Sequence, residues 1–236
     1  MIQPKTEFPP SVINPTSSLR APLKYPINLD PSCVCCYMPD HSTKWYDQSG
    51  CGNHGTVTNA VWQPRGRHDY CLYFDGTGDR VTIPDSTLFE GNTPFSIEFW
   101  ICPWVLPGDG LSRQIIAKNY PAAGSFYMDF NWAAATQITF YIVNNAAVQK
   151  MQWSNTIRVL NKWYHIVAVY TGAYMYLYSN GVTRVGVAQN GVTLAGGSVV
   201  IGSAGTGVKA RIDEFRFYRR ALNQHEVLTL YEAGRP

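Results

Sequence analysis

The chain has 236 residues, of which 45% are apolar and 15% are charged, and its formal net charge is +3. This length suits one large all-β domain, and the apolar share can fill a sizeable core. The positive charges are few and scattered, which excludes the basic surface that nucleic-acid binding requires. No apolar run approaches the length of a membrane span, and the first residues lack the apolar core of a signal peptide. We therefore expect no nucleic-acid partner, no membrane span and no signal peptide.

The first 32 residues are predicted to form an extended arm. Proline fixes φ and removes a backbone donor, so a proline-rich segment cannot join a sheet ladder. Ordering such a segment costs conformational entropy, which contact with a protein surface would offset. We expect residues 1–32 to contact other copies of the chain, or a capsid or surface protein. The prolines of this segment are Pro4, Pro9, Pro10, Pro15, Pro22, Pro26 and Pro31.

From residue 33 onward, apolar side chains recur at every second position in short runs. A period of two, rich in β-branched and aromatic residues, predicts half-buried strands. The Asn-Gly pair at 180–181 separates two such runs and predicts a type I′ hairpin. Many short strands joined by glycine-rich turns predict an antiparallel β-sandwich. The clearest runs are Leu72 and Phe74; Phe95, Ile97, Phe99 and Ile101; Ile138, Phe140 and Ile142; Val167 and Val169.

One short helix is predicted at the end of the chain. Asn223 is a favourable N-cap, and Glu226 stands three residues later, at the spacing of a capping box. Gly234 can end the helix. The predicted fold class is therefore all-β, with an antiparallel sandwich, a C-terminal helix and an N-terminal arm.

An aromatic stripe is predicted on the run that precedes the Asn-Gly turn. If Leu177 faces the core, the tyrosines on either side of it face outward. Exposed aromatic side chains stack on sugars or anchor protein interfaces, whereas a covered stripe would be ordinary packing, and all three interpretations remain open. The candidate residues are Tyr174, Tyr176, Tyr178 and, on another run, Trp100.

The acidic residues do not show the pattern of a glycoside hydrolase. Retaining hydrolysis needs two carboxyl groups about 5–5.5 Å apart, which residues on one face of a strand can supply. No two glutamates lie within two positions of each other. Asp213 and Glu214 are adjacent, so we expect their side chains on opposite faces. His165 lies in an apolar run and is expected to be a hydrogen-bonded strand histidine. We predict that the protein is not an enzyme.

Four segments of the body form an ordered series of motifs. They are DQSGCGNHGT at 47–56, LYFDG at 72–76, the hairpin from Trp163 to Gly181, and RIDEFRFYRRAL at 211–222. Together they resemble the laminin G-like jelly-roll family of the concanavalin A-like lectin/glucanase superfamily. The resemblance spans about 33–233 and implies one jelly-roll sandwich over residues 33–236. The arm has no counterpart in the family, and Cys51 departs from the usual small or polar residue of the first motif.

The resemblance also implies one structural Ca²⁺ ion between the first motif and the closing strand. The matching oxygen donors are Asp47, Asn53 and Asp213, and carboxylate and amide oxygens suit this cation. The alternative is that Asp47 and Asn53 form turns of the Asx type, and that Asp213 accepts backbone hydrogen bonds.

Three functions remain open. The first is a non-catalytic surface or assembly protein of a virion, such as a phage-like decoration or fibre-associated protein, which the arm and the low charge favour. The second is a calcium-dependent glycan-binding or adhesion module, which the resemblance implies but a fold alone does not establish. The third is a relative of glycoside hydrolases, against which the missing carboxylate pair argues. We expect an oligomer located on a virion surface or outside the cell.

Overall fold

The computed structural model describes residues 30–38, 43–67, 69–105, 112–131, 137–144, 148–153, 157, 159–183, 186–189 and 191–234. The side chains of 131 and 148–153 are not part of this description. Residues 1–29 lie outside the described residues, and with them lies most of the predicted arm.

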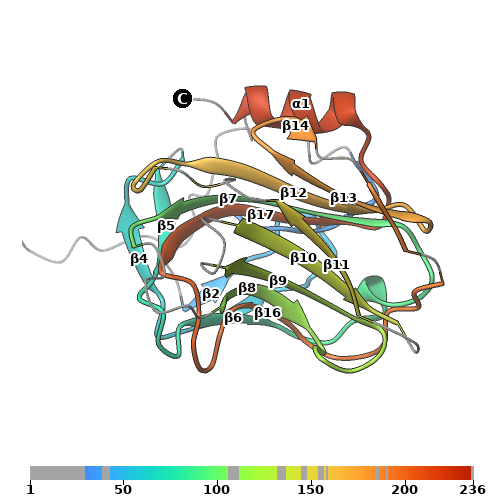
Figure 1. Ribbon diagram of the computed structural model, residues 1–236. Coiled ribbons are helices and arrows are strands. Elements are labelled where there is room, and N and C mark those ends of the chain that lie inside the picture. Colours follow the sequence, from blue (N-terminus) through green and yellow to red (C-terminus); the bar gives the residue numbers. More distant parts are fainter. Residues whose placement is uncertain are drawn as a thin grey trace, which may run out of the picture.

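Two antiparallel sheets pack face to face, which confirms the predicted sandwich (Figure 1). Sheet I has the order β14 (Val182–Thr183), β13 (Tyr174–Ser179), β12 (Tyr164–Tyr170), β7 (Phe95–Pro103), β17 (Ala210–Tyr218), β5 (Tyr70–Phe74) and β4 (Val61–Pro64), with β1 (Cys33–Cys36) on β17 and β15 (Val187–Ala188) on β13. Sheet II has the order β11 (Val148–Trp153), β10 (Gln137–Val143), β9 (Ser125–Asn131), β8 (Ser112–Lys118), β16 (Val199–Gly202), β6 (Arg80–Ile83), β3 (Gly55–Thr58) and β2 (Lys44–Trp45). A 3₁₀ turn, η2 (Thr87–Phe89), and one helix, α1 (Gln224–Ala233), complete the described elements.

The core fills the space between the sheets, and strand β7 shows why. Phe95, Ile97, Phe99 and Ile101 are each at most 2% exposed and belong to one apolar cluster with side chains of sheet II. The residues between them point to the opposite side, because successive side chains of a strand alternate. Each sheet therefore has an inner face in the core and an outer face, and only the outer faces can carry a site.

The local predictions at the C-terminal half are confirmed. Asn180 and Gly181 have φ values of 51° and 77°, as the two central residues of a type I′ turn require, and β13 pairs with β14 across them. Helix α1 begins with a capping box between Asn223 and Glu226 and ends at Gly234.

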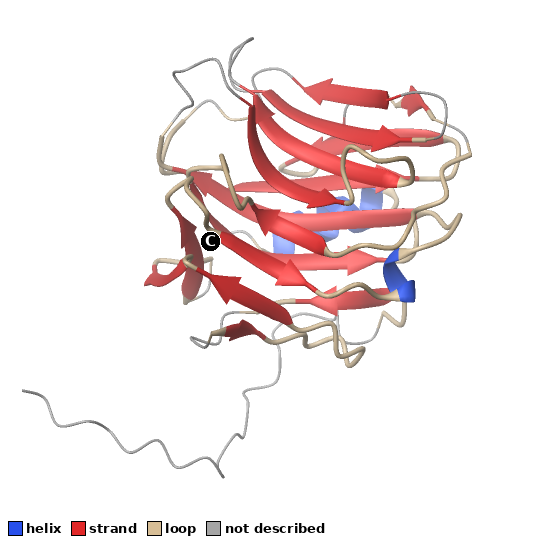
Figure 2. Ribbon diagram, turned by 90° about the horizontal axis from the view of Figure 1, so that it is seen from below, coloured by secondary structure: helices blue, strands red, loops and turns tan. Residues whose placement is uncertain are grey.

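The two outer faces differ in what covers them. Helix α1 lies on the outer face of sheet I, on the side away from sheet II (Figure 1). In Figure 2, seen from below, the strands of sheet II face the viewer and α1 lies behind them. Among the described residues, no helix has the length and apolar character that a membrane crossing requires.

Candidate functional site

Helix α1 covers part of the outer face of sheet I. The Asn223 side chain accepts a hydrogen bond from the Glu226 amide at 3.0 Å, and the Glu226 carboxylate accepts one from the Asn223 amide at 2.8 Å. This capping fixes the start of the helix and directs Val227, which is 0% exposed, onto the sheet. The buried residues of this second apolar cluster are Cys33, Cys36, Val167, Val169, Tyr178, Tyr218, Leu222 and Val227.

A charged cluster lies buried on the same face, around Glu98. One carboxylate oxygen accepts from Arg216 Nη1 at 2.7 Å and contacts His165 Nε2 at 3.0 Å, and the other accepts from the Tyr218 hydroxyl at 3.0 Å. Arg216 also pairs with Glu214 at 3.1 Å. Burial by itself would raise the pKa of Glu98, but Arg216 and His165 hold that pKa below its usual value. Arg216 is thus shared between two buried carboxylates, and His165 is the hydrogen-bonded strand histidine that the sequence predicts.

The prediction that Asp213 and Glu214 point to opposite faces is wrong. The pairing of β17 with β7 shifts register between Asp213 and Arg216, and Glu214 has a φ of 50°. This bulge lets Glu214 reach Arg216 on the face where Asp213 stands opposite Trp100. The two carboxylates therefore share one face. Both are at most 1% exposed, so a polysaccharide does not reach them in this structure.

Trp100 and Tyr178 point to the outer face of sheet I but are covered there, so they are not part of an exposed aromatic stripe. Trp100 is 2% exposed, stacks on Tyr231 of α1 with 5.9 Å between ring centroids, and has the Arg67 guanidinium 4.0 Å from its ring. Tyr178 is 6% exposed in the cluster beneath the helix. The sequence pattern placed both side chains on the outer face, but it could not show that α1 covers them.

Tyr174 and Tyr176 lie beyond the helix on β13. Tyr174 is 47% exposed and its ring centroid is 6.3 Å from that of Tyr176, which is half-buried. Leu177 is in the main core, as the prediction assumed. These two tyrosines are the accessible part of the stripe.

The structure brings Asp47 and Asn53 together in one loop. Asp47 Oδ1 accepts from the amides of Cys36 and Ser49 at 2.9 Å, and Oδ2 accepts from Ser49 Oγ at 2.8 Å and the Asn53 amide at 3.0 Å. The Asn53 side-chain amide donates to the Val34 carbonyl at 2.6 Å. This is the network of an Asx-type turn, and it ties the loop to β1.

Asp213 is held by a different set of groups. Its Oδ2 accepts from the Arg67 amide at 2.7 Å, its Oδ1 accepts from the Glu214 amide at 2.8 Å, and burial raises its pKa to about 8. Within the described part of the chain, no group of three or more His, Cys, Asp or Glu side chains is placed to hold a metal ion. Asp47 and Asn53 lie in one hydrogen-bond network and Asp213 lies in another, and the Ca²⁺ ion stays a prediction.

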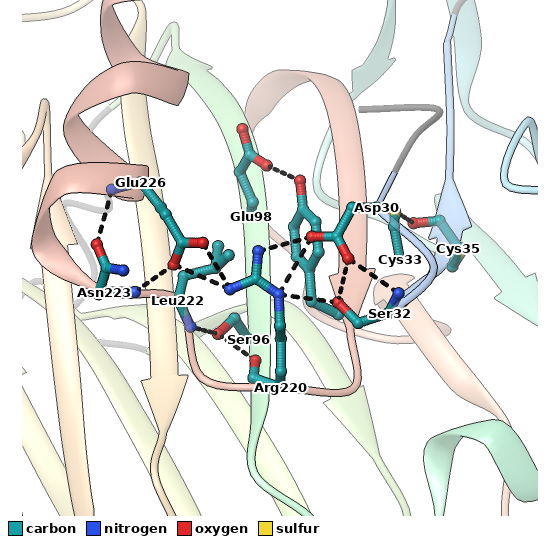
Figure 3. Close-up of polar contacts among 11 residues, drawn as sticks. Asp30, Ser32, Cys33, Cys35, Ser96, Glu98, Arg220, Leu222, Asn223 and Glu226 are labelled. Carbon is teal, nitrogen blue, oxygen red and sulfur yellow. Dashed lines mark hydrogen bonds and ion pairs between the residues drawn. The ribbon is translucent and has the colours of Figure 1, made fainter. Parts of the chain in front are cut away.

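A pocket lies between α1 and the point where the described chain begins. Arg220 is part of its lining and makes three contacts (Figure 3): Nη2 pairs with Asp30 at 2.7 Å, Nη1 pairs with Glu226 at 2.8 Å, and Nε donates to Ser32 Oγ at 3.1 Å. These contacts join the start of the sandwich to the helix. The pocket has a volume of about 190 Å³ and is lined by Asp30, Tyr218, Arg220, Leu222, His225, Glu226, Thr229 and Leu230.

The sequence reasoning missed a group of three tyrosines on sheet II, which we call the tyrosine patch: Tyr120, Tyr127 and Tyr141. Tyr120 stacks on Tyr127 with 4.4 Å between ring centroids and 23° between planes, and Tyr141 lies 5.5 Å from Tyr127. The Tyr141 hydroxyl donates to Asp129 at 3.3 Å. Tyr127 and Tyr141 could be placed on one face by their alternation with apolar neighbours. Tyr120 follows β8 in a turn, where no periodicity applies.

Comparisons with solved structures find other domains of the same fold. The chain matches the binding domain of Paraclostridial Mosquitocidal Protein 1 (TM-score 0.71, 19% identity, 85% of this chain and 52% of that chain). It also matches a botulinum neurotoxin serotype D ligand-binding domain in complex with N-acetylneuraminic acid (TM-score 0.70, 17% identity, 86% and 51%). A third is the binding domain of botulinum neurotoxin DC with rat synaptotagmin II (TM-score 0.69, 18% identity, 89% and 52%). The chain spans about half the length of these structures, and identities this low show a shared fold.

The family comparison is more specific. No curated protein matches the chain. The Laminin_G_3 family model, described as the concanavalin A-like lectin/glucanases superfamily, matches residues 75–228, which is more than half of the chain. With the jelly-roll sandwich and its closing helix, this match shows that the chain belongs to the concanavalin A-like lectin/glucanase superfamily.

Proposed function

We propose that this protein is a carbohydrate-recognition domain that binds its ligand without chemical turnover. The observation that supports this proposal is a difference between the outer faces of the two sheets. Helix α1 covers part of the outer face of sheet I and leaves Tyr174 exposed on β13, whereas the outer face of sheet II carries a stacked tyrosine pair of which Tyr120 is 39% exposed. Aromatic rings with a few polar groups nearby are the usual composition of a small-ligand site. Solved structures of similar fold include binding domains, one of them in complex with N-acetylneuraminic acid.

The placement of the acidic residues supports binding without catalysis. A hydrolase needs one carboxyl as acid and a second as nucleophile or base, both in contact with the substrate. Glu98, Asp213 and Glu214 share a face, but each is at most 1% exposed and each is engaged by neighbouring donors. A substrate would have to displace the side chains that bury Glu98, which include Arg216, His165 and Tyr218.

A glycan array probed with the purified chain tests this function. We expect retention on one or more glycans and no release of reducing ends from the same glycans in a parallel assay. The array is then repeated with Ca²⁺ and with a chelator, because the proposed ion at Asp47, Asn53 and Asp213 would make retention and thermal stability fall on chelation. No retention on any glycan would contradict carbohydrate recognition, and release of reducing ends would contradict binding without turnover.

A second candidate function is assembly on a particle, as a decoration or fibre-associated protein of a virion. The observation that favours it is the pocket beside Arg220, because the proline-rich segment joins the sandwich at Asp30, one of the residues that line it. The partner would be another copy of the chain or a capsid protein, and the protein would then act on a virion surface.

Deleting residues 1–29 tests this second candidate. The cut stops before Asp30, because Asp30 and Ser32 hold Arg220 and belong to the folded body. We expect a truncated chain that unfolds at the same urea concentration as the full chain but has lost its oligomeric mass in light scattering. A full-length chain that is monomeric at micromolar concentration, or a truncation that keeps the oligomeric mass, would contradict the assembly role.

A further inference from the structure

The tyrosine patch stands on a regular framework of paired strands. Tyr127 on β9 pairs with Tyr141 on β10 and with Ala117 on β8. Side chains directly opposite each other in a sheet lie on the same face, so these three residues form one row on the outer face of sheet II. Ala117 is small, which leaves room for the Tyr120 ring to lie over Tyr127. Backbone pairing on both sides of Tyr127 therefore fixes the ring on which Tyr120 stacks.

Polar groups line the next rows of the same face. Asp129 pairs with Thr139 on β10 and with Gln114 on β8, two positions along the strand from Tyr127. Ser125, two positions in the other direction, is 0% exposed, and its hydroxyl has no hydrogen-bond partner among the described residues. A buried polar atom without a partner costs free energy, which a bound water would relieve. Ser125 and Asp129 are at most 1% exposed, so the side chains of the patch that a ligand can reach are the exposed Tyr120 and the half-buried Tyr127 and Tyr141.

The geometry points to a binding platform at Tyr120, Tyr127 and Tyr141 for a neutral pyranose ring. This inference rests on the proposed carbohydrate recognition and names its site and ligand class. The exposed face of Tyr120 would carry the apolar face of the sugar ring, and the hydroxyls of Tyr127 and Tyr141 would meet the hydroxyls of the sugar. Tyrosine suits this task because its ring is apolar and its tip is polar.

A negative charge beneath the patch favours a neutral ligand. Burial raises the pKa of Tyr141 to about 12, and Asp129 adds to the increase there and at the half-buried Tyr127. A carboxylate on the ligand would be repelled by a charge at Asp129. Asp129 is thus a positioning residue, which holds the Tyr141 hydroxyl and disfavours acidic sugars.

The same surroundings argue against a protein as the occupant. The core of a protein interface is rich in apolar side chains, and only its rim is polar. Tyr120 is the single large apolar side chain that is strongly exposed among the described residues of β8, β9, β10 and the turn at 119–124. One aromatic ring surrounded by polar groups fits a single sugar ring better than a broad apolar surface.

The test is an isothermal titration of the full chain with lactose, cellobiose, chitobiose, maltose and 3′-sialyllactose. We expect at least one neutral disaccharide to bind, and Tyr120→Ala to weaken that binding at least about tenfold. Tyr120→Phe keeps the ring and should stay within about twofold. Tyr174→Ala removes the other exposed tyrosine and should leave the affinity unchanged. Asp129→Asn should reduce the preference for lactose over 3′-sialyllactose.

The outcomes separate the platform from the proposed function. Binding that survives Tyr120→Ala, with a melting temperature equal to that of the parent, overturns the platform and leaves carbohydrate recognition in place. Binding that Tyr174→Ala abolishes also overturns it and assigns the ligand to β13. Retention of acidic sugars alone overturns the neutral ligand class. If no sugar of this set binds and the glycan array is blank, both the platform and the proposed function fail.

Discussion

Replacing Glu98 with glutamine should cost about 3–5 kcal/mol of folding free energy. Glu98 is 0% exposed and its charge is the partner of Arg216, which is 2% exposed. The substitution keeps the shape of the side chain but leaves the buried guanidinium with Glu214 as its remaining carboxylate partner. Breaking one side of a buried ion pair is more costly than removing both. Urea unfolding followed by circular dichroism measures the loss.

Two comparisons make this result specific to the charged cluster. Glu90→Gln changes a half-buried glutamate outside the cluster and should stay within about 0.5 kcal/mol of the parent. Arg216→Met and Glu214→Gln, added together to Glu98→Gln, should restore part of the loss, because no member of the two ion pairs then keeps a buried charge without its partner. A loss below about 1 kcal/mol for Glu98→Gln alone, or a triple variant that is less stable still, would show that the cluster does not hold the sheet as described.

The same cluster predicts a dependence on pH. The pKa of Glu98 is held below its ordinary value of 4.5 in the folded chain, so the folded state binds fewer protons than the unfolded state as the pH falls. The stabilisation by Glu98 is present above the unfolded pKa and is lost as the pH falls through the folded pKa. The difference in unfolding free energy between the parent and Glu98→Gln should therefore be constant from pH 7 to about 5 and shrink below pH 4.5.

Replacing Val227 with aspartate should cost at least about 3 kcal/mol and release α1 from sheet I. Val227 is 0% exposed among the apolar side chains that join the helix to the sheet. A carboxylate at this position cannot stay ionised in that environment, so the helix must lift or the group must take up a proton. Urea unfolding measures the loss, and binding of the dye ANS reports the newly exposed apolar surface.

The matched control lies two residues further along the same helix. Thr229→Asp places the same charge on the exposed side of α1 and should change the unfolding free energy by no more than about 0.5 kcal/mol. Equal changes in unfolding free energy for Val227→Asp and Thr229→Asp would contradict the packing of α1 against sheet I.

The sandwich could be predicted because its signals are local. The alternation from Phe95 to Ile101 defines the inner face of β7, and the Asn-Gly pair at 180–181 defines a hairpin. The capping box of α1 is a spacing of three residues. Each of these signals is contained in a few neighbouring positions, and each is confirmed in the structure.

The site could be predicted only in part, because contacts between distant segments decide it. Alternation placed Trp100 on the outer face of β7, but whether a helix covers that face depends on residues that follow more than a hundred positions later. The bulge at Glu214 places the side chain of this residue on the face opposite to the expected one. No residue typical of turns indicates the bulge in the sequence. Tyr120 joins Tyr127 through a turn, so its position depends on tertiary structure and not on periodicity.

Backbone amide shift mapping of the ¹⁵N-labelled chain tests the central claim most directly: the ligand binds to the tyrosine patch of sheet II and not to sheet I. The titrant is the neutral glycan that the array retains best. We expect the largest chemical-shift changes in β9, β10 and the turn at 119–124, and unchanged amide signals in α1 and β12. Shifts concentrated on α1 and β13, with those of Tyr127 and Tyr141 unchanged, would contradict this claim.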